Sequence, residues 1–345
     1  MDNIFEIKDG MLVMYRGKEE HVVIPDGVTV IGKNAFSYIN IPPIHARLSD
    51  IKCDILASVT IPYGVESIED GAFSGRDGLT AVTIPESVKT IGKYAFSGCS
   101  SLASVTIPKN VTEIGENAFC RCGNLRTVTI PESVRSIGKG AFLECGNLDE
   151  IVVMGENSTY HSTGNCLIET ATKTLILGCK NSVIPTDGSV TIIGTGAFAH
   201  CEGLTSLTIP DTITEIGERV FACCTSLITV TIPESVKIIG KNAFNLCLCL
   251  SSVTIPNSVT EIGTGAFKQC WSLTSVTIPK NVTEIGENAF CGCRSLRTVT
   301  IPKSVKSIQN NVFSYCKSLT SVTIQDDTTE VGEYDFDEGA EIIHI

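Results

Sequence analysis

The sequence predicts a β-rich solenoid, and three observations lead to this prediction. A sequence motif centred on Val-Thr-Ile-Pro recurs along the 345-residue chain, mostly in steps of 23 residues. A Phe follows most of these prolines at a constant distance of eleven residues. The motif also has the two-residue alternation of a short strand, so Val and Ile point inward and Thr points outward. A single unit cannot bury its apolar side chains, whereas stacked units form a continuous core.

The repeated units can be counted from their anchor residues. Pro occupies the anchor at positions 62, 85, 108, 131, 210, 233, 256, 279 and 302. Pro25 and Pro185 head two further units, and Gln325 replaces Pro in the last, which gives 12 units. Proline offers no N–H to a ladder, so each strand should end there.

The Phe positions test this register independently. Twelve of the 13 Phe residues of the chain belong to the repeated position. We expect the interior to be built from their rings and from the Cys three residues later, for example Phe96, Phe119, Phe142, Phe221, Phe244, Phe267, Phe290, Cys224, Cys247 and Cys270. Between them, an Ile-Gly pair such as Ile262-Gly263 fits a second short extended segment followed by a bend or a close backbone approach. The Ala-Phe pair then fits a tight 3₁₀ or short helical turn.

The interruptions of the period define the expected organisation of a single solenoid over residues 1–345. We expect an N-terminal cap hairpin (1–24), repeats (25–154) with a loop insert (37–55), a hairpin insert (155–184), more repeats (185–324), and a degenerate last repeat with a closing strand (325–345). In the hairpin insert, Asn165–Ile168 and Thr174–Leu177 are the expected strands. At the C-terminus, Ala340, Ile343 and Ile345 reproduce the inward spacing.

Composition and charge exclude several classes of function. The formal net charge is −12, with 26 Lys and Arg against 38 Asp and Glu, which disfavours nucleic acid and anionic lipid as partners. There is no apolar run long enough for a transmembrane helix, so we expect no membrane insertion. No signal peptide is visible at the N-terminus.

The 16 Cys residues invite a disulfide or metal hypothesis. Nine of them share one repeat position, which favours a ladder of buried thiols that behave as small apolar groups. The Cys-x-Cys pairs 120/122, 247/249 and 291/293 lack the His cluster or the four-ligand spacing of a metal site, so we expect neither a metal nor a cofactor. The five His residues have no nucleophile and carboxylate at a catalytic spacing, and we expect no enzyme activity.

The candidate interaction surface is the outward face of the strands. Thr occupies the position two residues before most anchors, and Ser, Thr or Ala occupies the position four before them. Such hydroxyls also suit strands for structural reasons alone. The residues that interrupt this pattern are candidates for local specificity, together with one His from each insert: Arg126, Asp149, Glu150, Ile228, Arg297, His45 and His161.

The units resemble those of the BspA-like leucine-rich-repeat family, of the 23-residue type also seen in treponemal proteins. The resemblance rests on Ile-Pro-x-x-Val-x-x-Ile-Gly-x-x-Ala-Phe-x-x-Cys, as in residues 232–247, and covers about nine-tenths of the chain. It implies a right-handed, curved array of parallel strands. It also implies a surface or secreted protein of bacteria or protists that adheres to a protein or another host-surface macromolecule.

The sequence therefore predicts a non-enzymatic interaction or adhesion module that binds a macromolecule through its sheet face or its inserts. The alternative is a structural spacer that displays other parts of a longer protein and has no ligand of its own. The identity of the partner and the oligomeric state are left open by the sequence.

Overall fold

The structure is a computed structural model, and it describes residues 4–37, 55–326, 329–330, 336 and 340–345. The chain divides into two compact units, Met1–Ser162 (unit 1) and Thr163–Ile345 (unit 2). The loop insert expected at 37–55 lies outside the described residues except for its two ends. The expectation of a single solenoid over residues 1–345 stays a prediction.

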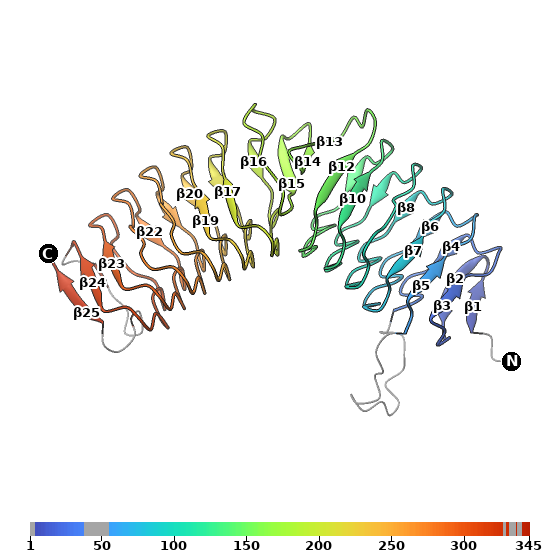
Figure 1. The fold of residues 1–345 in the computed structure, drawn as a ribbon, viewed down its shortest axis with the longest axis horizontal. Coiled ribbons are helices and arrows are strands. Elements are labelled where there is room, and N and C mark those ends of the chain that lie inside the picture. The colour runs from blue at the N-terminus through green and yellow to red at the C-terminus, as the bar shows by residue number, and fades with distance from the viewer. Residues whose placement is uncertain (1–3, 38–54, 327–328, 331–335, 337–339) are drawn as a thin grey trace, which may run out of the picture. The chain divides into compact units, whose positions relative to one another are not determined.

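Unit 1 consists of stacked coils whose short strands form two rows (Figure 1). The Val-Thr-Ile segments supply the first row: β3 (His21–Val23), β5 (Ser58–Thr60), β7 (Ala81–Thr83), β10 (Thr127–Ile130) and β12 (Glu150–Val153). The Ile-Gly segments supply most of the second row: β2 (Met11–Tyr15), β4 (Val30–Ile31), β6 (Ser67–Ile68), β8 (Thr90–Ile91), β9 (Glu113–Ile114) and β11 (Ser136–Ile137). β1 (Phe5–Lys8) pairs antiparallel with β2. β13 (Tyr160–Thr163) spans the chain boundary between the two units, after Ser162.

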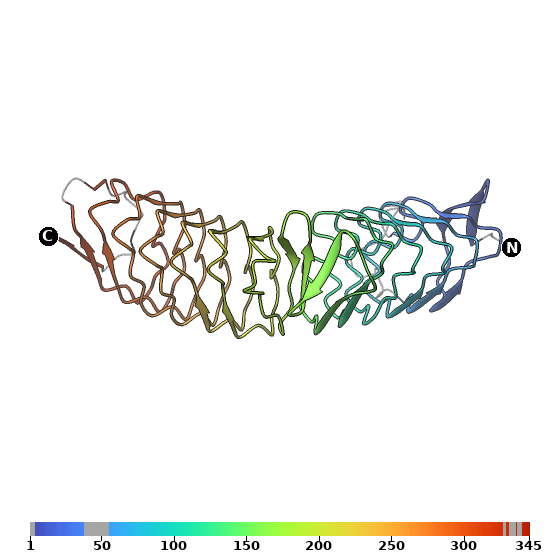
Figure 2. The same ribbon diagram turned by 90° about the horizontal axis from the view of Figure 1, so that it is seen from above.

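Unit 2 repeats this plan after an antiparallel hairpin of β14 (Cys166–Glu169) and β15 (Thr174–Leu177). Its first row holds β17 (Ser206–Thr208), β19 (Thr229–Thr231), β23 (Thr298–Ile301), β24 (Ser321–Ile324) and β25 (Glu341–His344). Its second row holds β16 (Ile192–Ile193), β18 (Glu215–Ile216), β20 (Ile238–Ile239), β21 (Glu261–Ile262) and β22 (Glu284–Ile285). Seen from above, successive coils of this unit lie side by side (Figure 2).

The strand pairing confirms the predicted β-rich solenoid with parallel strands. Ser58 faces Ala81 across β5 and β7, and Glu261 faces Glu284 across β21 and β22, each one 23-residue step apart. The Val-Thr-Ile segments at 104–107, 252–255 and 275–278 form no strand ladder, and only the bridge Ser252–Ser275 links the last two. The anchor Pro removes one N–H per coil, which limits the ladder on this face.

The turn that carries Ala and Phe is tight but not helical. Bonds of the i to i+3 type close it, as from Ser97 N to Tyr94 O at 3.0 Å. Two residues have a positive φ in every turn whose two positions are both described, such as Asn117 at 53° and Arg121 at 62°, and a left-handed residue interrupts a 3₁₀ or α-helix. The expected helical turns are therefore wrong, and the described residues contain no helix that could span a membrane.

The Phe rings form a continuous stack inside each unit. In unit 1 the stack runs from Phe36 to Phe142, and Tyr15 extends it at one end with a centroid distance of 4.9 Å to Phe36. In unit 2 it runs from Phe198 to Phe336, with successive centroids 5.1 to 5.5 Å apart. The rings from Phe198 to Phe313 have no accessible surface. The equal coil length thus places each ring nearly parallel to the next, at a centroid distance at which aromatic pairs attract each other.

The Ile-Gly position is a point of close contact between coils. Gly115 does not have a positive φ; instead, a Cβ on it would lie 2.5 Å from the Gly92 carbonyl carbon and from Lys93 N. Of the two reasons that the sequence offered for this glycine, close backbone approach is therefore the one that applies. We expect Gly115→Ala to lower the free energy of unfolding by about 1–3 kcal/mol, because the backbones must move apart. Urea unfolding followed by circular dichroism measures this change.

Gly123 in the same unit provides the matched control. It also lacks a positive φ, and a Cβ there meets no atom within 4 Å. Gly123→Ala should leave the urea midpoint within error or raise it slightly. Equal destabilisation by both substitutions would show that close approach of the coils is not the cause.

The closing strand exists, but its side chains are not buried. β25 pairs parallel with β24, with Ile343 opposite Thr323. Ile343 is 38% exposed and Ile345 is 71% exposed, so the inward placement expected for them is wrong. The register pairs Ile342 with the buried Val322 and Ile343 with the outward Thr323, so Ile343 and Ile345 lie on the outward face of the strand, one residue out of the expected phase.

Candidate interaction surface

Three of the candidate residues lie together at the start of β10 and β12. The Arg126 guanidinium and the Asp149 carboxylate form an ion pair at 3.5 Å. The backbone N–H groups of Asp149 and Glu150 both donate to the Arg126 carbonyl oxygen, at 2.7 and 3.2 Å. Both ion-pair partners are well exposed, so the pair contributes little to stability and remains accessible to a partner.

Ile228 and Arg297 occupy the same repeat position as Arg126, but they lie in unit 2 and three coils apart. Each precedes a strand of the first row, and Ile228 is 51% exposed. The carbonyl of Ile228 accepts from Ser251 N at 3.2 Å, and that of Arg297 accepts from Thr320 N at 2.9 Å. The structure therefore does not bring these two residues together into one site.

The two candidate histidines give no site in the structure. His161 lies half-buried in β13. His45 falls outside the described residues. The described part of the chain holds no group of three His, Cys, Asp or Glu side chains arranged for a metal ion.

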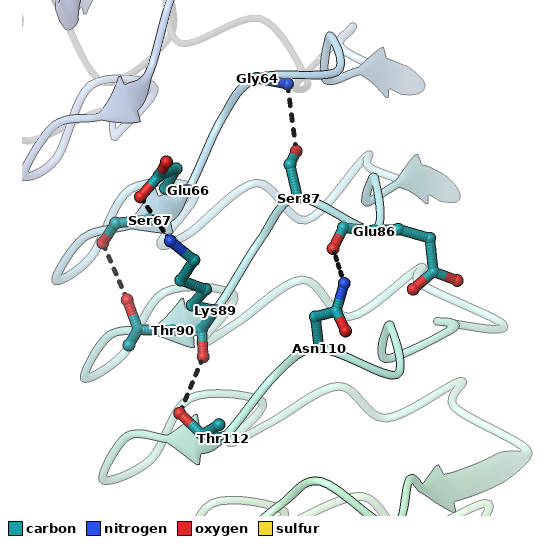
Figure 3. A network of polar contacts seen from close by, with 9 residues as sticks. All are labelled: Gly64, Glu66, Ser67, Glu86, Ser87, Lys89, Thr90, Asn110 and Thr112. Carbon is teal, nitrogen blue, oxygen red and sulfur yellow. Dashed lines mark hydrogen bonds and ion pairs between the residues drawn. The ribbon is translucent and has the colours of Figure 1, made fainter.

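Hydroxyl and amide groups link neighbouring coils along the surface of unit 1 (Figure 3). Thr112 donates to the Lys89 carbonyl at 3.3 Å, and Asn110 donates to the Glu86 carbonyl at 2.7 Å. Lys89 also forms an ion pair with Glu66 at 2.8 Å. Much of the polar surface is thus engaged in holding the coils in register. Thr112 and Asn110 follow the anchor Pro108, so they lie outside the hydroxyl-rich strand positions that precede each anchor.

The outward Thr residues of the first strand row are different, because most of them are exposed. In unit 2 they include Thr208, Thr231, Thr254, Thr277 and Thr300. At the hairpin end of this row Val183 takes the Thr position and is 70% exposed.

A groove lies at this end of the strand face of unit 2. Its volume is about 290 Å³, and its lining consists of six hydroxyl side chains and four apolar ones: Ser182, Thr186, Ser206, Thr208, Thr229, Thr231, Val183, Ile184, Leu207 and Pro210. None of them is charged. Sequence reasoning missed this groove, because the coil that carries Val183 lacks the Thr of the repeat and was assigned to the insert.

The cysteine ladder is a structural feature of the interior. The Cys247 thiol donates to the Phe221 carbonyl at 3.1 Å, and Cys270 donates to Phe244 at 3.2 Å. The same carbonyls accept from the backbone N–H of the Cys in their own coil, as from Cys247 N to Phe244 O at 3.2 Å. Each thiol therefore joins two coils, a reason for Cys at this position that the sequence did not reveal.

Burial controls the ionisation of these thiols. It raises the pKa of Cys122, Cys247 and Cys293 well above the usual value, and neighbouring thiols add to the shift. It also raises the pKa of Cys166 to about 12. These groups are protonated at neutral pH, and a protonated, inaccessible thiol is a poor nucleophile.

The comparison with known families decides the classification of this fold. The sequence profile described as "BspA type Leucine rich repeat region (6 copies)" matches residues 51–165, 176–297 and 260–345. The chain belongs to the BspA-type leucine-rich-repeat family. No protein with a curated description matches it.

Solved structures that include leucine-rich-repeat proteins resemble this chain over nearly its whole length. A leucine-rich cell surface protein of Faecalibacterium prausnitzii is 26% identical, with a TM-score of 0.61, covering 95% of this chain and 94% of its own. A leucine-rich-repeat protein of Bacteroides ovatus is 27% identical, with a TM-score of 0.51 and coverages of 99% and 97%. The pneumococcal vaccine antigen PcpA is 20% identical, with a TM-score of 0.65 and coverages of 97% and 91%, which shows the shared fold.

Proposed function

We propose that this BspA-type chain is a protein-interaction module of a bacterial cell surface, and that it holds its partner on the strand face of unit 2. The observation that carries the proposal is the uncharged groove between Val183 and Thr231. Membership of a family with bacterial surface proteins among its structural neighbours supports the location. The repeat fold and the protonated interior thiols support a non-catalytic role.

The lining of the groove indicates what it binds. Hydroxyl groups can donate to and accept from the peptide groups of an extended polypeptide. Val183, Leu207 and Pro210 supply apolar contact for its side chains. Sugar rings commonly stack on an aromatic side chain, and none lines the groove. We therefore propose an uncharged, extended polypeptide segment as the ligand.

The experiment first selects ligands of the full chain and then tests whether they bind in the groove. Peptides of about ten residues would be selected from a random displayed library against the full chain, alongside an array of neutral glycans. Binding of the selected peptides would then be measured with Thr208→Arg/Thr231→Arg, which fills the groove with two long cations. We expect uncharged peptides to be selected and their affinity to fall at least about tenfold in this variant.

Thr60→Arg/Thr83→Arg is the matched control, because these exposed Thr residues hold the same repeat position in unit 1. Its affinity for the selected peptides should equal that of the unchanged chain. Equal loss in both variants would refute the groove as the site. No selected peptide and no glycan bound would favour the spacer role instead.

Deleting residues 155–184 would not test this proposal. Ile168 and Leu175 of the hairpin have no exposed surface and belong to the core of unit 2. Loss of binding after such a deletion would follow from unfolding. Surface substitutions therefore test the binding site without this effect on folding.

A further inference from the structure

A second surface of unit 2 lies where each coil turns after its buried Phe. We call the segments 245–250, 268–273, 291–296 and 314–319 the turn edge. They hold three cations, Lys268, Arg294 and Lys317, and no Asp or Glu, in a chain whose net charge is −12. Arg294, Lys317 and the exposed Trp271 hold one repeat position in three successive coils, so they follow one another along the edge.

These cations are not neutralised by the fold. A turn of unit 1 shows the contrast. Arg121 lies two residues before the repeat position that Arg294 holds in unit 2, and its guanidinium pairs with Glu144 of the next coil at 2.8 Å. No ion pair between described residues involves Lys268, Arg294 or Lys317. Lys268, Arg294 and Lys317 therefore present positive charge that no ion pair among the described residues compensates.

An aromatic ring fixes one of these cations. The Arg294 guanidinium carbon lies 4.2 Å from the centroid of the Trp271 ring. This stacking holds the guanidinium in place and leaves its in-plane N–H groups available to an acceptor. It also covers one face of the ring, which is then closed to a stacking sugar.

The backbone of the same edge adds an independent observation. Leu246, Gln269 and Tyr315 have φ values of 62°, 58° and 60°, in the left-handed region that favours glycine. Gly292 holds this position in the intervening coil, at 76°, so the fold does not require a side chain there. Tyr315 is 68% exposed and places an aromatic ring on the edge despite the conformational cost.

We propose that the turn edge binds an acidic polypeptide segment that carries aromatic or aliphatic side chains between its carboxylates. Arg294 and Lys317 would pair with successive carboxylates, and the planar guanidinium suits bidentate pairing. Trp271 and Tyr315 supply apolar contact beside the charges. The acidic remainder of the chain repels such a segment from other surfaces, so the charge pattern directs it to this edge.

Trp271 gives a direct measurement, because it is the single Trp of the chain. The probe is a peptide of four Glu-Glu-Leu units, titrated into the full chain while Trp emission is followed, with a Lys-Lys-Leu peptide as the charge control. Heparin is titrated separately as a sulfated polysaccharide. We expect the acidic peptide alone to bind saturably, with an affinity that falls as salt rises.

The variant Arg294→Glu/Lys317→Glu should weaken this binding at least about tenfold. Lys237→Glu/Lys280→Glu makes the same change of net charge at exposed positions outside the turn edge, and it should change the affinity less than twofold. Equal loss in both variants, no peptide binding, or binding of heparin alone would each overturn the proposal. The groove variants of the strand face leave the turn edge intact, so failure of one site is distinguishable from failure of the other.

Discussion

Phe244→Ala should lower the free energy of unfolding of unit 2 by about 3–5 kcal/mol. The ring has no exposed surface and lies between Phe221 and Phe267, with centroid distances of 5.1 Å to each. Its removal leaves a cavity and also interrupts the stack at its middle. Because coils of a repeat array stabilise their neighbours, the loss should spread to both adjacent coils. Urea unfolding gives the magnitude, and amide hydrogen exchange locates the weakened coils.

Thr254→Val serves as the control for this prediction. Thr254 lies one coil from Phe244 in the sequence but points outward and is exposed. Its replacement should leave the urea midpoint nearly unchanged. A Phe244→Ala protein with an unaltered midpoint would contradict the role of the stack, and strong destabilisation by Thr254→Val would contradict the outward placement of the Thr row.

Stability should also fall steeply above about pH 8.5, where thiols of an unfolded chain begin to ionise. Burial raises the pKa of the thiols in the folded state, including Cys122, Cys247 and Cys293. The folded protein therefore keeps protons that the unfolded chain releases. The stability from these thiols is fully present below the unfolded pKa and is lost as pH rises towards the folded pKa. Each such thiol should contribute a slope of about 1.4 kcal/mol per pH unit in this window.

Urea unfolding at intervals between pH 7 and 10.5, under a reducing agent, measures this slope. Cys270→Ala removes one buried thiol whose pKa is raised chiefly by burial. It should reduce the slope by about 1.4 kcal/mol per pH unit. Leu273→Ala is the matched variant, because it removes a buried side chain of the same coil that does not titrate. It should lower stability at every pH without changing the slope, and identical slopes in all three proteins would contradict the prediction.

The sequence anticipated the candidate interaction surface less well than the fold. Arg126 and Asp149 meet in the structure because they hold equivalent positions in adjacent coils, with Glu150 next to Asp149 in the chain, and the repeat register makes this foreseeable. The groove beside Val183 was not foreseeable from the repeat, because it arises where the register is broken. The turn edge was missed because Trp271, Arg294 and Tyr315 lie in separate coils, and each is unremarkable within its own.

The sequence by itself determined the β-rich solenoid, because a constant 23-residue step brings identical positions of successive coils into contact. It also determined which residues of the Val-Thr-Ile segments face outward, since strand alternation and the anchor Pro leave one choice. Only the tertiary structure decided the features that depend on the distance between coils and on backbone angles. These include the non-helical turn with its left-handed residues, the close approach at Gly115, and the hydrogen bond from most ladder thiols, such as that of Cys247, to the Phe carbonyl of the preceding coil. Such contacts depend on where a neighbouring backbone lies, and no spacing within one coil encodes that position.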